Sequence, residues 1–175
     1  VHPQFWPEDL DYTGKRVVII GSGATAVTLL PAMTDRAEHV TMLQRTPTYI
    51  VSVPNEDPIA KFLAKRMPRE RAYALTRRKN IALQRWTYKL SQKHPNFVRK
   101  LIRATVVTHF NPPYGPWDQR LCSVPDGDLF RAIRAGKASV VTDRIGRFTK
   151  RGIELESGNE LEADIVVTAT GFEAQ

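Results

Sequence analysis

The chain has a single cysteine, Cys122, so no disulfide can form within it. This makes a cytoplasmic setting the default expectation. No apolar run approaches the ~20 residues that a helix needs to cross a bilayer, and the first residues lack the basic and then apolar pattern of a secretory signal peptide. These absences exclude a disulfide scaffold and a transmembrane helix, and they argue against secretion.

An initiating methionine and a closing signal are also lacking. The chain begins at Val1 and stops at Gln175, shortly after an apolar strand pattern. We interpret it as a domain excised from a longer protein. Its 175 residues, of which 42% are hydrophobic, suffice for one globular domain with its own core. We find neither an internal repeat nor a low-complexity segment.

Acidic residues are nearly absent from one part of the chain. Between Lys61 and Arg103 there are fourteen Lys or Arg and one acid, Glu70, so this segment carries +13 while the whole chain carries +8. We call residues 58–103 the basic lobe and expect it to be helical. Its cations could form a solvated face, or a field that attracts an anionic cofactor or an acidic partner. No recognition motif accompanies the charge, so nucleic-acid binding is not expected, and the weak apolar stripe argues against membrane-surface contact.

The most informative motif follows an apolar run at residues 16–20. Gly21 lets the chain turn sharply off this predicted strand, Gly23 leaves room for a pyrophosphate to approach the backbone, and Ala26 keeps the next helix close to the sheet. The free N–H groups at the N-terminus of that helix would bind phosphate. The alternative is a tight strand-to-helix turn without a ligand. The predicted phosphate-binding turn consists of Gly21, Ser22, Gly23, Ala24, Thr25 and Ala26.

A second candidate position lies 24 residues after Gly21, at the end of the second predicted strand. An acid there would bind the ribose hydroxyls of NAD, whereas an arginine favours the 2′-phosphate of NADP. The chain has Arg45 and Thr46 and no acid from Thr41 to Ile50. A guanidinium and a hydroxyl can hold a phosphate together, so we predict NADP or NADPH as the ligand. The alternative is that Arg45 is an ordinary exposed residue.

The order of the predicted elements indicates an α/β, doubly wound (Rossmann-like) nucleotide-binding domain. A linker segment (1–15) precedes the domain (16–175), and the basic lobe is inserted into it. Pro31 should kink the first helix or end it early. We expect a hairpin at 147–149 and 152–155 as a small antiparallel excursion. The other expected elements are strands at 16–20, 39–44, 139–142 and 165–168, helices at 24–33 and 129–135, and a loop at 111–116.

Three ordered motifs resemble the flavin-dependent monooxygenases of the Baeyer–Villiger type. His2 to Pro7 resembles the end of the family's Phe-x-Gly-x-x-x-His-x-x-x-Trp-Pro signature, which a Gly-x-Gly-x-x-Gly/Ala turn follows, as here. Ala169 to Phe172 resembles the Ala-Thr-Gly motif where the family's chain leaves its NADPH domain. The likeness is strongest to the ketone monooxygenase subgroup that includes the mycobacterial ethionamide-activating enzyme. The connection near 105–113 is shorter than is usual in that subgroup.

The resemblance implies the cofactors and the reaction. NADPH would bind this chain, and FAD would bind mainly to segments outside it, since the chain has only one Gly-x-Gly turn. The partners implied are the FAD domain of the same parent chain, O₂, and a small carbonyl, sulfur or nitrogen substrate. The reaction inserts one oxygen atom beside a ketone carbonyl or onto the heteroatom. The isolated fragment should not turn over substrate.

The resemblance also implies roles for single residues. Arg120 corresponds to the family's catalytic arginine, whose fixed charge stabilises the anionic oxygen species and the charge that develops as oxygen is transferred. His2 and Trp6 would position the cofactor or the linker, and Thr170 and Gly171 would lie beside the cofactor. Neither histidine nor cysteine spacing predicts a metal site.

Two other functions stay open at this stage. The chain could be the NAD(P)H domain of another flavoprotein oxidoreductase with two dinucleotide sites, although the His-x-x-x-Trp-Pro segment argues against a disulfide reductase. It could also be a non-enzymatic module that binds polyanions through the basic lobe.

Overall fold

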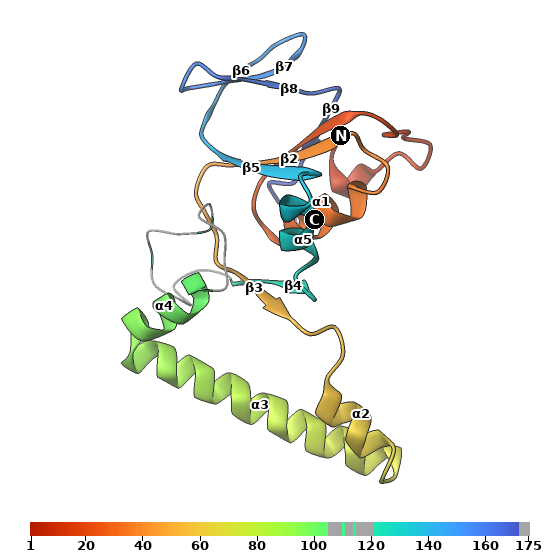
Figure 1. The fold of residues 1–175 in the computed structure, drawn as a ribbon, viewed down its shortest axis with the longest axis vertical. Helices are drawn as coiled ribbons and strands as arrows, with labels where there is room; N and C mark the ends of the chain where they lie inside the picture. The colour runs from red at the N-terminus through yellow and green to blue at the C-terminus, as the bar shows by residue number, and fades with distance from the viewer. Residues whose placement is uncertain (105–109, 111–113, 115–120, 172–175) are drawn as a thin grey trace.

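The computed structural model describes residues 1–104, 110, 114 and 121–171. At its centre lies a four-stranded sheet of order β5-β2-β1-β9, in which every neighbouring pair is parallel (Figure 1). The prediction of a mixed α/β domain with a parallel sheet is therefore confirmed, and the predicted strands agree with the observed ones to within one residue. These are β1 (Arg16–Ile20), β2 (His39–Gln44), β5 (Ala138–Thr142) and β9 (Ile165–Thr168).

Helix α1 (Ala24–Met33) connects β1 to β2 and buries an apolar stripe against the sheet. Pro31 lies inside this helix, where it cannot donate to the carbonyl of Val27. The helix continues for two residues and then ends, because the amide and the hydroxyl of Thr34 both donate to the Pro31 carbonyl. The early end predicted from Pro31 thus falls within one turn of it.

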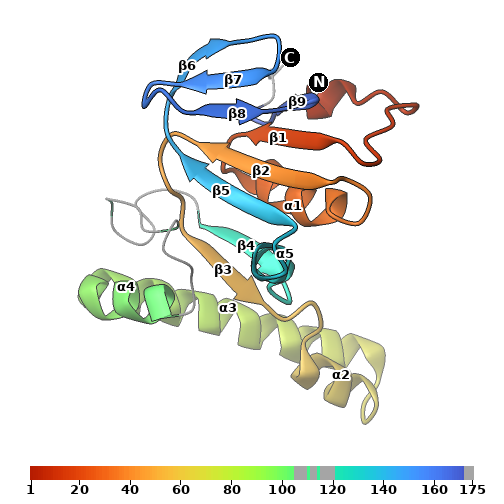
Figure 2. The same ribbon diagram turned by 45° about the horizontal axis from the view of Figure 1, so that its top comes forward.

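The two faces of the parallel sheet pack against different layers (Figure 2). Val17 and Ile19 of β1 belong to the core shared with α1 and α5 (Asp128–Arg134), whereas Val18 contributes to a second core on the opposite face. This alternation follows from the two-residue period of a strand. A doubly wound fold has helices on both faces of its sheet. Within the described residues no helix covers the second face, so the prediction holds for the strand order but not for the layers on either side of the sheet.

A three-stranded antiparallel sheet covers that second face instead. It consists of β6 (Ile145–Phe148), β7 (Gly152–Leu155) and β8 (Glu160–Glu162) in the order β6-β7-β8. Ile153 and Leu155 of β7 supply its buried side chains. Strand β8 was not predicted from the sequence, because three residues of which two are acidic show no apolar run.

A small parallel sheet lies on the other side of α1 and α5. Strands β3 (Ile50–Val53) and β4 (Cys122–Pro125) pair in parallel, with Ile50 opposite Cys122. Neither strand was predicted, since each has four residues and its partner lies about 70 positions away. Ile50, Cys122 and Val124 join the main core, so the pair is fixed to the body of the domain.

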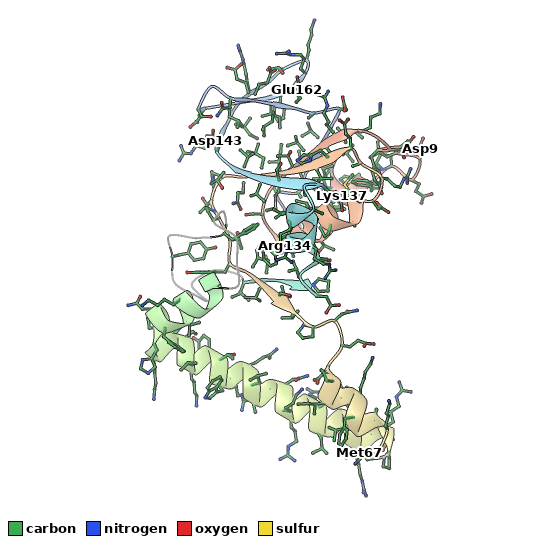
Figure 3. All side chains as sticks on the ribbon, in the orientation of Figure 1. Asp9, Met67, Arg134, Lys137, Asp143 and Glu162 are labelled. Atoms are coloured by element: carbon green, nitrogen blue, oxygen red, sulfur yellow. The ribbon has the colours of Figure 1, made fainter. Side chains whose placement is uncertain are left out.

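The basic lobe is helical, and its chain runs between β3 and β4. It contains α2 (Pro58–Ala64), α3 (Arg69–Lys93) and α4 (Pro95–Ala104), and α3 packs against both shorter helices. Only Ala72 and Ser91 of α3 are buried. Figure 3 places Met67 at the end of the lobe far from the parallel sheet. The lobe exposes large apolar side chains, namely Ile59, Phe62, Tyr73, Leu75, Ile81, Leu83, Trp86, Tyr88 and Phe97.

An ion pair between Arg16 and Asp164 joins the starts of β1 and β9 and makes the stability of the fold depend on pH. Asp164 accepts hydrogen bonds from the Arg16 amide at 2.8 Å and from its guanidinium at 3.1 Å. These contacts lower the pKa of Asp164 to about 2 from its ordinary 3.8. A carboxyl group whose pKa is lower in the folded than in the unfolded chain stabilises the fold at pH values above its unfolded-state pKa. That stabilisation is lost as the pH falls through the folded-state pKa.

We therefore expect the thermal midpoint to fall between about pH 4 and pH 2, and we expect Asp164→Asn to flatten that part of the profile. Circular dichroism melts across this range measure it. Asp9→Asn, which removes an exposed carboxylate elsewhere, is the control. A profile as steep in Asp164→Asn as in the wild type would contradict the assignment.

Candidate nucleotide-binding site

The ends of β1 and β9 meet at the carboxyl edge of the parallel sheet. The chain leaves β1 toward β2 on one side, while β9 lies on the other side of β1. Such a reversal of strand order is where open α/β sheets bind their ligands. The Gly21 turn follows β1 and the Ala169-Thr170-Gly171 segment follows β9, so the structure brings two predicted motifs together.

A cleft of about 1100 Å³ opens at this edge. Of the predicted site residues it brings together Gly21, Ser22, Gly23, Ala24, Thr25, Arg45, Thr46, Thr170 and Gly171. Ala26 does not line the cleft. It belongs to α1 and is fully buried in the main core, which agrees with its predicted part in keeping the helix close to the sheet.

The N-terminus of α1 faces the cleft without an obstructing side chain. Gly23 caps the helix, and a Cβ built on it would have no atom within 4 Å. No side chain caps this terminus and no acid lies in its first turn. The first N–H groups of a helix lack partners within the helix, so the site can bind an anion.

The glycine turn is tied to the segment after β2. The Ser22 hydroxyl lies 3.0 Å from the Thr48 hydroxyl and 3.4 Å from the Thr46 carbonyl. Thr48 also lines the cleft and was not among the predicted residues. The contact fixes the predicted phosphate-binding turn relative to Arg45 and Thr46.

A second arginine, Arg144, lines the cleft and was not predicted from the sequence. The segment after β5 and the β7–β8 turn contribute Asp143, Arg144, Ile145 and Glu156 to the cleft wall. The predicted strand at 139–142 contained the signal, because a strand parallel to β2 must end at the same edge as Arg45. Neither guanidinium, of Arg45 or of Arg144, forms an ion pair within the described part of the chain.

His2 lies beside the site and does not line the cleft. Its Nδ1 accepts from the Gln4 amide at 3.2 Å at the start of η1 (Pro3–Phe5), so the neutral ring carries its proton on Nε2. Nε2 lies 2.9 Å from the Gly171 carbonyl, to which it donates. His2 thereby joins the segment before the domain to the segment after β9. Trp6 packs against the main core and touches no part of the cleft.

Arg120 and the predicted loop at 111–116, apart from Tyr114, lie outside the described residues, as does most of the connection near 105–113. A second cleft of about 400 Å³ shares Gly23, Ala24 and Thr48 with the first and reaches Tyr114 and Cys122. Cys122 is buried, and as the one cysteine of the sequence it forms no disulfide within the chain. Burial raises the pKa of Tyr114 above its ordinary value, so its phenol stays protonated near neutral pH.

Among the residues that the structure describes, no helix is both long and apolar enough to cross a membrane. Among the same residues, no three His, Cys, Asp or Glu side chains come together as a metal-binding group.

Comparison with known proteins shows close relatives. The chain is 57% identical to the probable FAD-binding monooxygenase AlmA of Acinetobacter baylyi over 185 aligned residues, which cover 100% of this chain and 37% of the relative. It is 55% identical to the FAD-containing monooxygenase EthA of Mycobacterium tuberculosis over 186 residues, or 100% of this chain and 38% of the relative. The chain thus spans less than two-fifths of the curated relatives it matches. No family model matches it.

Solved structures share the fold. OTEMO in complex with FAD and NADP superposes with a TM-score of 0.69 at 20% identity, covering 99% of this chain and 42% of that one. Oxidized steroid monooxygenase bound to NADP gives a TM-score of 0.66 at 21% identity over 99% of this chain and 42% of that one. Along its whole length the chain is homologous to one region of the FAD-containing monooxygenases, which confirms the family resemblance predicted from its motifs.

Proposed function

We propose that the chain is the NADPH-binding part of an FAD-dependent monooxygenase. Residues 1–15 are the linker into this part, residues 16–175 form the nucleotide-binding domain, and the basic lobe (58–103) is an insertion in it. The observation that carries the proposal is one cleft lined both by the predicted phosphate-binding turn and by Arg45 and Arg144, which form no ion pair among the described residues. The printed names of the relatives and the NADP bound by the structural neighbours support it.

The residues of the cleft fit the parts of NADPH. The N-terminus of α1 and the open backbone at Gly23 suit the pyrophosphate. The Arg45 guanidinium and the Thr46 hydroxyl, with Arg144 after the neighbouring strand β5, suit the 2′-phosphate. Thr170 and Gly171 line the cleft where β9 ends, next to the turn. His2 does not contact the cofactor in this proposal. It positions Gly171 through the hydrogen bond to the Gly171 carbonyl.

The reaction belongs to the longer protein. When FAD is bound and reduced by NADPH, it supplies the chemistry that inserts one oxygen atom of O₂ beside a ketone carbonyl or onto a sulfur or nitrogen. Arg120 is our proposed catalytic residue, because a permanent cation stabilises developing negative charge. The FAD domain of the same parent chain is the proposed partner, and the exposed apolar side chains of the basic lobe support further contacts of this kind.

The test of the proposed function is cofactor choice. We expect the chain to bind NADP more tightly than NAD, and Arg45→Ala to lose about 1.5–3 kcal/mol of that preference, since a charge-assisted contact to the 2′-phosphate is removed. Calorimetric titration of both nucleotides measures it. Arg134→Ala removes an equal charge from exposed surface at the end of α5 and is the control. Equal affinity of the wild type for both nucleotides would refute the proposal.

A further inference from the structure

Asp143 lines the same cleft as Arg45 and Arg144 and directly precedes Arg144 in the chain. It follows β5 directly, at the point where the chain passes into the three-stranded sheet (Figure 3). Its amide donates to the Gln44 carbonyl at 3.0 Å. Gln44 is the last residue of β2 and precedes Arg45. The backbone that carries Arg144 is therefore attached to the backbone that carries Arg45.

The Asp143 side chain fixes the next residue. Its Oδ1 accepts from the Arg144 amide at 2.7 Å. The Arg144 carbonyl in turn accepts from the Glu156 amide at 2.9 Å, which comes from the β7–β8 turn. Both backbone groups of Arg144 are thus held, while its guanidinium stays exposed at the cleft wall.

The β7–β8 turn also holds the carboxylate itself. Hydrogen bonds from the Ser157 hydroxyl and the Arg144 amide keep the pKa of Asp143 below its ordinary value, so it is ionised at neutral pH. The Ser157 hydroxyl oxygen accepts from the Asn159 amide group at 3.1 Å, which leaves its proton free to donate. The antiparallel sheet therefore fixes one wall of the cleft through Asp143.

We propose that Asp143 is a positioning residue for cofactor choice: it holds the backbone of Arg144 beside the end of β2, so that the guanidinium groups of Arg144 and Arg45 reach one phosphate. The inference rests on the proposed function, because it takes the 2′-phosphate of NADP as the shared ligand. Charge alone predicts the opposite effect. A carboxylate at the wall repels a phosphate, so its removal alone would tighten NADP binding.

Two substitutions separate these expectations, since Asp143→Ala and Asp143→Asn remove the same charge. Asparagine retains an oxygen that can accept from the Arg144 amide, whereas alanine does not. We expect Asp143→Ala to lower the ratio of NADP to NAD affinity about tenfold, and Asp143→Asn to keep most of it. Titration of both nucleotides, calorimetrically, measures the ratio. Glu154→Gln, which removes a carboxylate paired with Arg147 in the same sheet, is the control.

A double-mutant cycle tests whether Asp143 acts through Arg144. In an Arg144→Ala background, Asp143→Ala should change the ratio no further. Ser157→Ala should also lower the ratio of NADP to NAD affinity, by less than Asp143→Ala does. If Asp143→Ala fails to fold, Ser157→Ala replaces it in the test. Tighter NADP binding in both Asp143 variants, or an equal loss for both nucleotides, would overturn the inference. The proposed function fails separately, through a wild type without cofactor preference.

Discussion

Replacing Gly23 with valine should abolish nucleotide binding and leave the domain folded. The backbone at Gly23 has φ −78° and ψ −177°, which valine adopts readily. A Cβ there meets no protein atom within 4 Å, so the side chain projects into both clefts and not into the core. It would occupy the space through which a pyrophosphate reaches the helix N-terminus.

Fluorescence titration with NADPH measures the loss of binding, and circular dichroism reports the fold. Gly23→Ala is the graded control, because it adds only the Cβ and should weaken binding less. A folded Gly23→Val variant with wild-type affinity would show that no phosphate binds at this turn.

Replacing Gly21 with alanine, only two residues earlier, should instead destabilise the fold by about 2–5 kcal/mol. Gly21 has φ +125°, a conformation that residues with a side chain rarely adopt. Its Cβ would lie 2.5 Å from the Ala169 carbonyl oxygen. Neither backbone can retreat easily, because the Gly21 amide bonds to Leu43 and the Ala169 amide bonds to Ile20, each at 2.8 Å.

Urea denaturation of Gly21→Ala and Gly23→Ala measures the difference. The two variants make the same chemical change two residues apart, and only the first should lower the midpoint strongly. Equal midpoints for Gly21→Ala and the wild type would mean that β1 and β9 can separate at this edge at little cost.

The central sheet could be predicted because each of its strands has a recognisable pattern in a short stretch of sequence. A run such as Arg16–Ile20, followed by small residues and then a helical pattern, indicates both the strand and its crossover from neighbouring residues alone. The phosphate-binding turn and Arg45 follow from the same local pattern. The structure brings them to one cleft, and their part in binding stays a prediction.

The rest depends on contacts between distant segments. Strands β3 and β4 become strands only by pairing with each other, and four-residue runs carry too little periodicity to show it. Arg144 could have been inferred from the end of β5, but its fixed backbone could not, because the Glu156 amide that holds it comes from another sheet. The packing of the three-stranded sheet on the second face of the parallel sheet was not predicted for a similar reason. Ile153 and Leu155 form a short run that does not reveal which surface it buries.

The β3–β4 pair sets a lower limit on how short the basic lobe can become. Because the strands are parallel, a chain that leaves at Val53 must travel back along the strand before it can enter at Cys122. Parallel strands need a connection of about a dozen residues or more, and here 68 residues lie between them. A tight turn can never replace the lobe. Any crossover above the minimum length satisfies the pair, which leaves most of the lobe free to vary in size between related proteins or to be exchanged by design.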